Sequence, residues 1–469
     1  MQRRGRSRAL PAVLAVLGGL VLSGCATIVI GQPRAPEPAR PGGGGGGSGE
    51  VTVIGAEEGT VDDRARDALA DLELFWGQTF PEVYGEQFPP LQGGYFSVDP
   101  DDVDPREYPN GVVGCGAQPL EVESNAFYCL AGAAPNSDSI TYDRQFLAEL
   151  ADGYGEFIPA LVMAHEFGHA VQGRVGQPGP SIATETQADC FAGAWTRWVA
   201  DGEAPNSRLR GPELDELLRG YLLLRDPVGT STAAESAHGS YFDRVSAFQE
   251  GFDSGVEACR DNFGPDRIYT QGSFSDQDEA LSGGNAEYDV LLEIVAESLP
   301  TVWGQAFRDV FEEEFDAPDI GVFDGDAPDC ARDADLELVH CAEEDLVAFD
   351  EPDLGRPAYS EIGDFALATA VAIPYSLEVR EQLGLSTDDE DAVRSALCLT
   401  GWYAAKIFNG QAGAAVVISP GDLDESVQFL LTYGNDPAVL PDVDLSGFQQ
   451  VDLFRAGFVQ GLAACDVGA

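Results

Sequence analysis

His165-Glu166-Phe167-Gly168-His169 is the stretch of sequence that decides the expected fold and chemistry of this chain. Residues before it have the apolar spacing of a helix, with a proline in the tolerated first turn: Phe157, Ile158, Pro159, Leu161, Val162 and Ala164. Because residues four apart share one helix face, His165 and His169 can direct both imidazoles at one cation. Glu166 lies beside them, near enough to deprotonate a metal-bound water. The motif therefore predicts a helical zinc centre with His165 and His169 as ligands and Glu166 as catalytic base.

A third metal ligand is expected downstream, because a catalytic zinc takes three protein ligands and keeps one position open. Glu185-Thr186-Gln187-Ala188-Asp189 opens a second helical stretch, and its two carboxylates are four residues apart on one face. We expect Glu185 to be the third ligand. We expect Asp189 to accept the outer N–H of a ligand histidine and so fix its tautomer. The alternative, with Asp189 as the ligand, stays open on the sequence alone.

His238 precedes a third predicted helix, in the run Ser236-Ala237-His238-Gly239-Ser240. Apolar residues at helical spacing follow, and Ser240 with Asp243 is typical of an N-cap with an acid in the first turn. At that position His238 could donate a hydrogen bond to the oxyanion of a tetrahedral intermediate. A purely structural histidine fits the pattern equally well.

The composition narrows the classes of partner. The chain has 469 residues, enough for about three domains of average size, and 44% of them are apolar, which excludes global disorder. Its 80 acidic and 26 basic residues give a net charge of −54. A field of that sign repels phosphate backbones, so we expect no nucleic-acid partner. A solvated surface is the simplest reading of the acidity.

The N-terminus is typical of an export signal. Arginines precede an apolar stretch, Ala9 to Leu22, that is too short for a membrane span, and Leu22-Ser23-Gly24-Cys25 follows. Small residues before a cysteine at this place resemble a bacterial lipoprotein signal, which implies a lipid on Cys25 and membrane attachment. An ordinary secretory signal is the alternative. A Gly- and Pro-rich tether follows, and the exported compartment permits disulfides.

Taken together, the motifs resemble those of the bacterial neutral zinc metallopeptidase family. The resemblance covers roughly residues 60–265 and is carried by the HEFGH helix and the following segments: Cys115-Gly116, Phe127-Tyr128-Cys129, Ile140-Thr141-Tyr142-Asp143, Gln172, Glu185 to Gly193, His238-Gly239-Ser240, Arg244, Gly251-Phe252 and Cys259. It implies a zincin-like fold, a glutamate as third zinc ligand, and proteolysis. Two positions depart from the family pattern, Ala170 and Phe248.

The C-terminal part reads as an internal repeat without the chemistry. Phe75-Trp76-Gly77-Gln78 returns as Val302-Trp303-Gly304-Gln305, and the pattern from Phe242 to Cys259 returns 206 positions later, from Phe448 to Cys465. At an offset of 208, five site positions carry other residues: His165, Glu166, His169, Glu185 and Asp189 become Ile373, Pro374, Leu377, Val393 and Leu397. At 206, His238 becomes Asp444. The second copy is therefore expected to hold no zinc.

The nine cysteines divide as one for lipid and four for each copy. Three pairings are possible within each set of four. We favour Cys115–Cys129, Cys190–Cys259, Cys330–Cys341 and Cys398–Cys465. Free buried thiols are the alternative.

These observations predict a mainly α (α+β) fold, a zincin-like helical domain with a small sheet, tandemly duplicated. The expected segments are a signal peptide (1–24), a tether (25–57), a zinc metallopeptidase domain (58–264), a linker (265–284) and a degenerate copy (285–469). We expect an exported, lipid-anchored peptidase with one Zn²⁺ per chain, a peptide or protein substrate, and Ser139–Tyr142 as the strand that pairs with it. The acid-rich stretches 99–104 and 319–335 are expected to be solvated turns. A non-catalytic binding or scaffold lipoprotein with a vestigial or structural zinc site is the rival.

Overall fold

The computed structural model describes residues 51–132, 134–331, 336–413, 416–441 and 443–468. Helices dominate and two small sheets accompany them, so the predicted mainly α (α+β) class is confirmed. The predicted signal peptide, the lipidated Cys25 and most of the tether lie outside the described residues. No helix among the described residues is both long enough and apolar enough to cross a membrane.

The first half combines one four-stranded sheet with a helical layer. Its strands are β1 (Val53–Ile54), β2 (Gly94–Val98), β3 (Ala126–Cys129) and β4 (Ser139–Asp143). Its helices are α1 (Val61–Tyr84), α2 (Pro119–Val122), α3 (Arg144–Tyr154), α4 (Ile158–Val175), α5 (Ser181–Ala200), α6 (Gly211–Leu224) and α7 (Tyr241–Asp261).

The second half follows a short helix, α8 (Gln277–Ser282), which lies within the predicted linker. Its strands are β5 (Asp319–Phe323), β6 (Leu338–Cys341) and β7 (Leu346–Asp350). Its helices are α9 (Tyr288–Ala306), α10 (Arg356–Glu361), α11 (Asp364–Gln382), α12 (Glu390–Phe408), α13 (Asp422–Tyr433) and α14 (Gly447–Gln460).

The two sheets share one topology. In the first, the order is β1-β2-β4-β3, with β2 parallel to β4 and β3 antiparallel to it. In the second, the order is β5-β7-β6, with β5 parallel to β7 and β6 antiparallel to it. In both halves the sheet is followed along the chain by a short helix and then by four longer ones. The two halves therefore have a similar order of elements, although β1 and α2 have no counterpart among the described elements of the second half.

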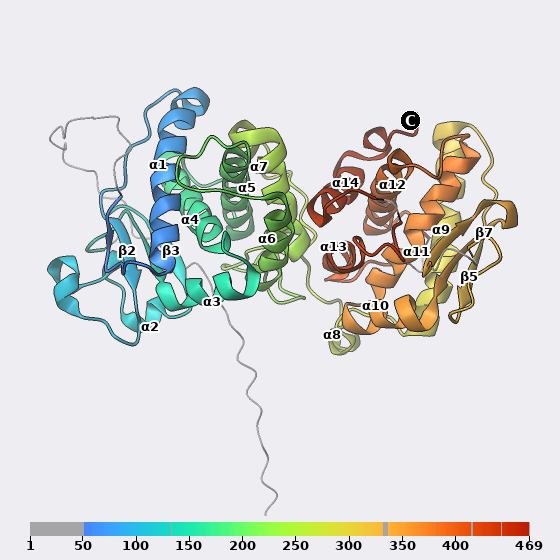
Figure 1. Ribbon diagram of the computed structural model, residues 1–469, viewed down its shortest axis with the longest axis horizontal. Helices are drawn as coiled ribbons and strands as arrows, with labels where there is room; N and C mark the ends of the chain where they lie inside the picture. Colours follow the sequence, from blue (N-terminus) through green and yellow to red (C-terminus); the bar gives the residue numbers. More distant parts are fainter. Residues whose placement is uncertain (1–50, 133, 332–335, 414–415, 442, 469) are drawn as a thin grey trace, which may run out of the picture.

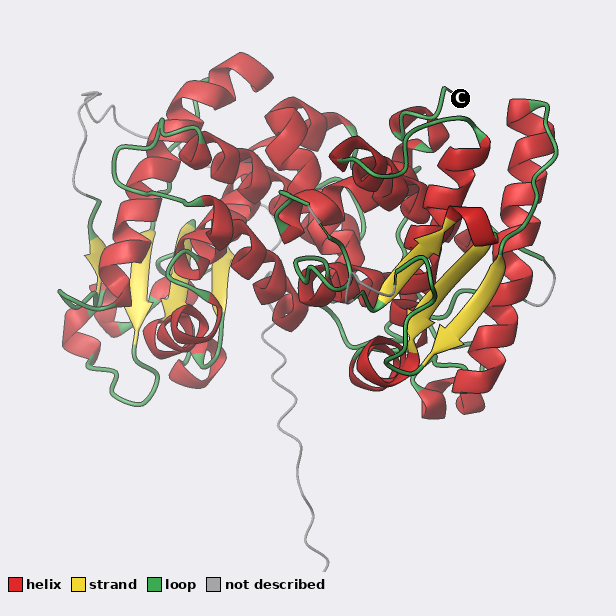
Figure 2. Ribbon diagram, turned by 45° about the vertical axis from the view of Figure 1, so that its right-hand side comes forward, coloured by secondary structure: helices red, strands yellow, loops and turns green. Residues whose placement is uncertain are grey.

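The sheets stand at the two outer ends of the molecule, and the helical layers meet between them (Figures 1 and 2). Helices α6 and α7 of the first half contact α13 and α14 of the second. The centre of the molecule, where the two halves meet, is therefore built mainly from packed helices.

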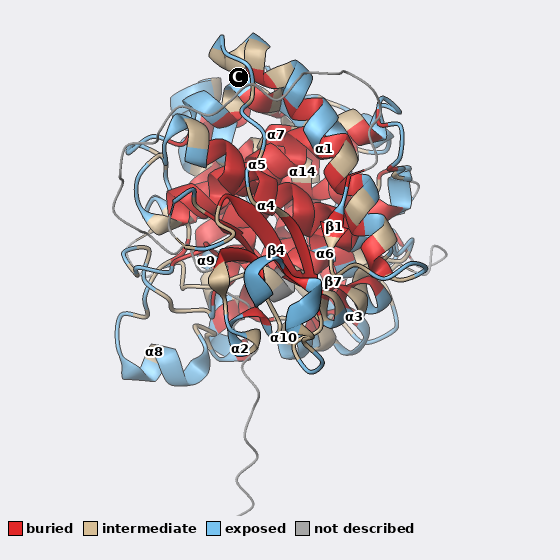
Figure 3. Cartoon of the chain, turned by 90° about the vertical axis from the view of Figure 1, so that its left-hand side faces the viewer, coloured by how far each residue is buried: buried red, intermediate tan, exposed pale blue. Residues whose placement is uncertain are grey.

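The helices α4, α5 and α7 form the buried centre of the first half (Figure 3). Glycine permits their close approach: a Cβ at Gly168 in α4 would lie 2.9 Å from Cα of Ala188 in α5. A Cβ at Gly193 would lie 1.9 Å from the carbonyl oxygen of Phe248 in α7. A side chain larger than that of glycine would collide at Gly168 and at Gly193. These two glycines therefore determine how closely α5 packs against α4 and α7.

Four disulfides join the cysteines in the favoured pairs, and that prediction is confirmed: Cys115–Cys129, Cys190–Cys259, Cys330–Cys341 and Cys398–Cys465. The second and fourth of them connect α5 to the end of α7 and α12 to the turn after α14. A native disulfide typically stabilises a domain by about 2–4 kcal/mol. Four of them indicate an oxidising, extracytoplasmic environment.

Three details differ from the sequence-based expectations. Residues 51–57 belong to the folded body rather than to the tether, because β1 pairs with β2 and buries Val53. Residues 319–323 form strand β5 rather than a turn, because they pair in parallel with β7 along its whole length. Strand β4 is flanked by β2 and β3 on both sides, so it has no free edge for a substrate.

Candidate metal centre

The HEFGH motif lies in the middle of α4, as the sequence predicted. Helix α5 crosses it at Gly168 and brings Glu185 to the two histidines. His165, His169 and Glu185 are all buried. The structure therefore brings the three predicted ligands together from two helices.

The three groups meet at one point. Nε2 of His165 lies 3.2 Å from Nε2 of His169 and 3.3 Å from Oε2 of Glu185. Nε2 of His169 lies 3.5 Å from the same Glu185 oxygen. Ligand atoms of a tetrahedral zinc centre with bonds of about 2.0–2.1 Å are about 3.3–3.4 Å apart. The triangle thus has the size of one face of a zinc tetrahedron.

The hydrogen bonds of the two histidines place their protons on Nδ1, away from the point where the three ligand atoms meet. Nδ1 of His165 lies 2.8 Å from Oδ1 of Asp189, and Nδ1 of His169 lies 2.8 Å from Oε1 of Gln172. Both partners are acceptors, so each Nδ1 carries a proton, and each Nε2 presents a lone pair when both rings are neutral, the form that binds a metal. Oε2 of Glu185 is buried and has no hydrogen-bond donor. Three acceptor atoms that face one another in this way fit a bound cation.

The local charge favours a cation as well. Burial by itself would lower the pKa of His165, but the charges of Asp189 and Glu185 outweigh it and raise that pKa to about 10. Burial opposes ionisation of Glu185, yet the neighbouring His169 and His165 hold the pKa of its carboxyl well below the usual range. The cluster therefore keeps a proton when no metal is present, and a metal ion can take its place.

Glu166 is held in place by a contact with the sheet. Its Oε2 accepts a hydrogen bond from the backbone N–H of Tyr128 in β3, at 2.7 Å. Burial raises the pKa of the Glu166 carboxyl, against the opposing effect of His169 and His165. The contact leaves Oε1 as the oxygen that can exchange a proton. It also shows that β3, the edge strand of the sheet, runs beside the centre.

A buried arginine completes the surroundings of Asp189. Arg244 in α7 donates from Nε to Oδ2 and from Nη2 to Oδ1 of Asp189, both at 2.8 Å. Such a bidentate pair fixes the carboxylate that orients His165. Arg244 is one of the residues that carry the family resemblance, but it was assigned no role because nothing local connects it to Asp189, 55 residues earlier. Gln172 was detectable, since it follows His169 by three residues on one helix face.

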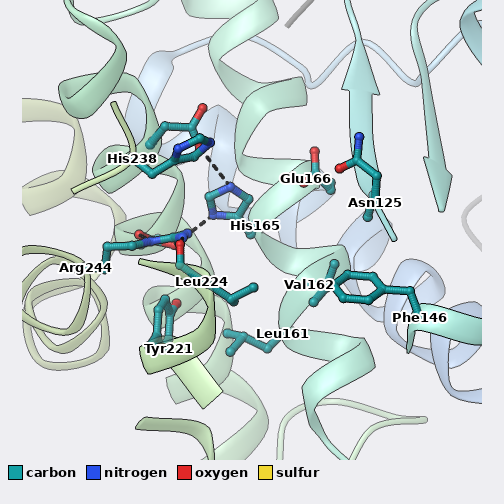
Figure 4. A pocket seen from close by; sticks show the side chains of 13 residues that line it. Asn125, Phe146, Leu161, Val162, His165, Glu166, Tyr221, Leu224, His238 and Arg244 are labelled. Atoms are coloured by element: carbon teal, nitrogen blue, oxygen red, sulfur yellow. Dashed lines mark hydrogen bonds and ion pairs between the residues drawn. The ribbon is translucent and has the colours of Figure 1, made fainter. Parts of the chain in front are cut away.

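His238 lies in the wall of the pocket beside the centre, where the sequence left its role open. The pocket has a free volume of about 50 Å³, room for a few water molecules. Figure 4 shows Glu166 and Asn125 on one side of His165, with His238 and Arg244 on the other. Nδ1 of His238 lies 3.1 Å from Oδ1 of Asp226. Donation from Nε2 to a substrate therefore requires the doubly protonated ring.

The corresponding place in the second half is apolar. Ile373, Pro374, Leu377 and Val393 line a cavity of about 630 Å³ there. Its rim includes His340, whose Nε2 lies 2.8 Å from Oε2 of Glu378. None of the first half's metal-binding groups has a counterpart at these positions.

Comparison with known proteins relates the chain to bacterial proteins of unknown activity. It is 28% identical over 181 residues to the uncharacterised protein Rv2575 of Mycobacterium tuberculosis, an alignment that covers 33% of this chain. The chain spans only 60% of the length of that mycobacterial relative. It is 30% identical over 221 residues to the uncharacterised protein YpfJ of Escherichia coli, covering 42% of this chain and 69% of YpfJ.

No family model matches the chain, and no solved structure matches it. The similarity to YpfJ extends over more than two thirds of that protein. The chain therefore belongs to the same family as the uncharacterised protein YpfJ of Escherichia coli.

Proposed function

We propose that the first half of this chain is a zinc-dependent metallopeptidase that hydrolyses peptide bonds. One observation carries the proposal: Nε2 of His165, Nε2 of His169 and the donorless Oε2 of Glu185 lie 3.2–3.5 Å apart, next to the carboxyl of Glu166. A purely structural zinc site has no need of an additional carboxyl group in the next helical position.

In this proposal His165, His169 and Glu185 hold Zn²⁺. When bound, the ion supplies Lewis acidity toward the scissile carbonyl and lowers the pKa of water to about 7. Glu166 accepts the proton of the attacking water at Oε1 and passes it to the leaving amine. The raised pKa of Glu166 suits both steps, because the group must first take a proton and then release it.

The edge strand β3 supports the binding of an extended substrate. No strand pairs with its outer edge in the described part of the sheet, and the Tyr128 N–H on that edge faces Glu166. A peptide added along β3 would bring its backbone past the metal ligands. His238, on the other side of the pocket, is suited to hydrogen-bond the oxyanion.

The remaining expectations complete the proposal. We infer that the protein is exported and anchored through a lipid on Cys25, with a peptide or protein as substrate and no nucleic-acid partner. We infer further that the second half is a copy of the first that lacks the zinc site. The common order of elements, the matched disulfides and the apolar residues at the ligand positions support that inference.

The deciding experiment compares Glu166→Gln with Glu149→Gln, a control on the exposed face of α3. Both variants and the wild type should contain one zinc per chain by elemental analysis. Only Glu166→Gln should lose hydrolysis of a denatured protein, by about 10²–10⁴-fold. Unchanged turnover in Glu166→Gln would remove it from the mechanism. Zinc without any chelator-sensitive hydrolysis in the wild type would favour the binding or scaffold role. A second zinc per chain would contradict the inference that the second half lacks a zinc site.

A further inference from the structure

A second cluster of donor groups, separate from the proposed zinc centre, lies where the inter-half segment meets α11 and α13. Asp364 begins α11, while Asp422 and Glu425 lie in the first turn of α13. One carboxylate oxygen from each lies within 4.8 Å of the other two. Of the metal-sized donor sets in the described residues, only this one and the zinc set consist wholly of buried residues.

Backbone N–H groups satisfy only part of this negative charge. Asp364 accepts from the N–H of Ala286, Glu425 accepts from that of Phe365, and Asp422 accepts from that of Ser419. Each of these contacts occupies one oxygen. No arginine, lysine or histidine forms an ion pair with the three carboxylates in the part of the chain that the structure describes.

One oxygen of the cluster has no donor at all. Oδ1 of Asp364 is buried and has no hydrogen-bond partner, and the whole residue is only 7% exposed. The side chain of Asp364 is close enough to that of Glu425 to form a hydrogen bond when one of them is protonated. If Asp364 and Glu425 are both ionised, two negatively charged acceptors face each other. A cation or a proton between them would remove this repulsion.

The first half shows how the same place is neutralised when arginine is available. Glu216 packs against Gly155 there as Glu425 packs against Gly363 here. In the first half the neighbouring Glu156 pairs with Arg64. Glu213 of that half pairs with Arg210 at 2.7 Å. The second half keeps the acids and lacks both arginine partners.

We propose that Asp364, Asp422 and Glu425 bind a divalent cation of the calcium class. The donors are all oxygens, which suits a hard cation, and Ca²⁺ accepts irregular sets of six to eight oxygens more readily than Mg²⁺. Water molecules would complete the coordination. Extracellular calcium sites commonly bind in the range of about 10⁻⁴–10⁻³ M, which suits an oxidising compartment outside the cytoplasm.

The cation would fasten the segment before α9 to the second half. Asp364 accepts a hydrogen bond from the N–H of Ala286. It also donates its own backbone N–H to Oδ1 of Asn285, at 2.6 Å. Glu279 of α8 accepts from the hydroxyl of Ser419 at 2.8 Å. Helix α8 itself has no buried residue (Figure 3).

Without a cation the cluster has to hold protons. Burial raises the pKa of the Asp364, Asp422 and Glu425 carboxyls, and repulsion from neighbouring carboxylates adds to the rise at Asp422 and Glu425. A cluster that only holds protons should give no calcium-binding signal, whereas a calcium site should give one. Neither result depends on peptidase activity.

The test uses the full chain, stripped of metal and reloaded with one equivalent of Zn²⁺. We expect calorimetric titration with CaCl₂ at neutral pH to show one site per chain, and Ca²⁺ to raise the unfolding temperature more than equimolar Mg²⁺ does. Asp364→Asn should weaken Ca²⁺ binding at least tenfold. The matched control is Glu156→Gln, at the corresponding place in the first half, and it should bind Ca²⁺ like the wild type.

Glu425→Gln provides a second variant if Asp364→Asn does not fold, and the same loss is expected. No heat and no thermal shift in the wild type at about 5 mM Ca²⁺ would overturn the proposal, given the usual range of extracellular sites. Ca²⁺ binding that survives both substitutions, or equal binding of Mg²⁺, would overturn it too. Because zinc content and hydrolysis are measured separately, failure here leaves the peptidase proposal untouched.

Discussion

Oδ1 of Asp424, in the second half, accepts a hydrogen bond from the backbone N–H of Phe242 in the first half, at 2.9 Å. The reciprocal contact is present as well: Oδ1 of Asp215 accepts from the N–H of Phe448 at 2.8 Å. Each carboxylate thereby caps the first turn of the opposite half's last long helix, α7 or α14. The two halves thus meet through equivalent contacts made in both directions.

The aromatic contacts across the same interface are reciprocal too. The ring of Phe242 lies 4.9 Å from that of Phe458, and the ring of Phe252 lies 5.0 Å from that of Phe448. In the predicted repeat, Phe242 corresponds to Phe448 and Phe252 to Phe458. The interface therefore has the character of a two-fold interface between like subunits, although one chain supplies both sides.

Asp424 also connects the second half to the proposed zinc centre. Its Oδ2 accepts from Nη1 of Arg225 at 2.6 Å. The preceding residue, Leu224, accepts a hydrogen bond from Arg244 at its carbonyl oxygen. Arg244 in turn binds Asp189, the carboxylate that orients His165. The second half therefore supports the position of Asp189 through this chain of hydrogen bonds.

Asp424→Ala should therefore affect stability and metal binding together. We expect the free energy of unfolding to fall by about 1–3 kcal/mol, because buried donors lose their acceptor. Zinc affinity should fall several-fold in competition titration. Asp215→Ala removes the reciprocal contact and should destabilise similarly without changing zinc affinity. An equal loss of zinc affinity in both variants would mean that stability alone is responsible.

Asp189→Asn tests the orientation of His165 directly. The amide cannot keep both the His165 contact and the bidentate Arg244 pair, so we expect zinc affinity to fall by about 10–100-fold. Zinc titration against a competing chelator measures this. Asp201→Asn, in the exposed pair with Arg197 at the end of the same helix, is the control and should bind like the wild type. Normal zinc affinity in Asp189→Asn would exclude it as a positioning residue.

His238→Gln tests the proposed oxyanion contact. We expect kcat to fall by about 10²-fold, the loss typical of removing one such donor, with zinc content unchanged. Steady-state kinetics on a peptide substrate separate kcat from KM. His340→Gln changes the only other histidine that is not a proposed ligand and should leave kcat unaltered. If His238→Gln alters KM alone, the residue binds substrate and does not stabilise the oxyanion.

The carboxylate cluster of the second half predicts a distinctive pH dependence in calcium-free protein. The folded-state pKa values of Asp364, Asp422 and Glu425 lie above their ordinary values, so the folded protein binds more protons than the unfolded one above about pH 4. Their contribution is therefore least unfavourable near pH 4 and becomes more destabilising as pH rises toward neutrality. The acidic groups nearest to them act in the same direction: Asp424 and Glu279.

Chemical denaturation at pH 5 and pH 8 measures this effect by difference. We expect Asp364→Asn to gain stability relative to the wild type at pH 8 and to gain less at pH 5. Glu156 corresponds to Asp364 in the first half and is paired with Arg64. Glu156→Gln should therefore show no gain in stability that grows with pH. Added Ca²⁺ should abolish the advantage of Asp364→Asn at pH 8. A difference that does not vary with pH would contradict the raised pKa values.

The sequence by itself determined the features that depend on local spacing. His165, Glu166 and His169 could be placed on one helix because four residues make about one helical turn, and Glu185 and Asp189 followed by the same rule. The cysteine pairs were favoured among three possible pairings in each set of four, and the structure contains those four disulfides.

Only the tertiary structure decided which segments become neighbours. Strand β4 was expected to bind substrate, but the sheet order leaves the free edge to β3. Arg244 reaches Asp189, and Asp424 reaches Phe242, across separations of 55 and 182 residues. The acids at 364, 422 and 425 form a cluster only once α11 and α13 pack together. Helical periodicity is fixed by the backbone over a few residues, whereas these contacts depend on how whole helices and strands pack, and no local pattern encodes that.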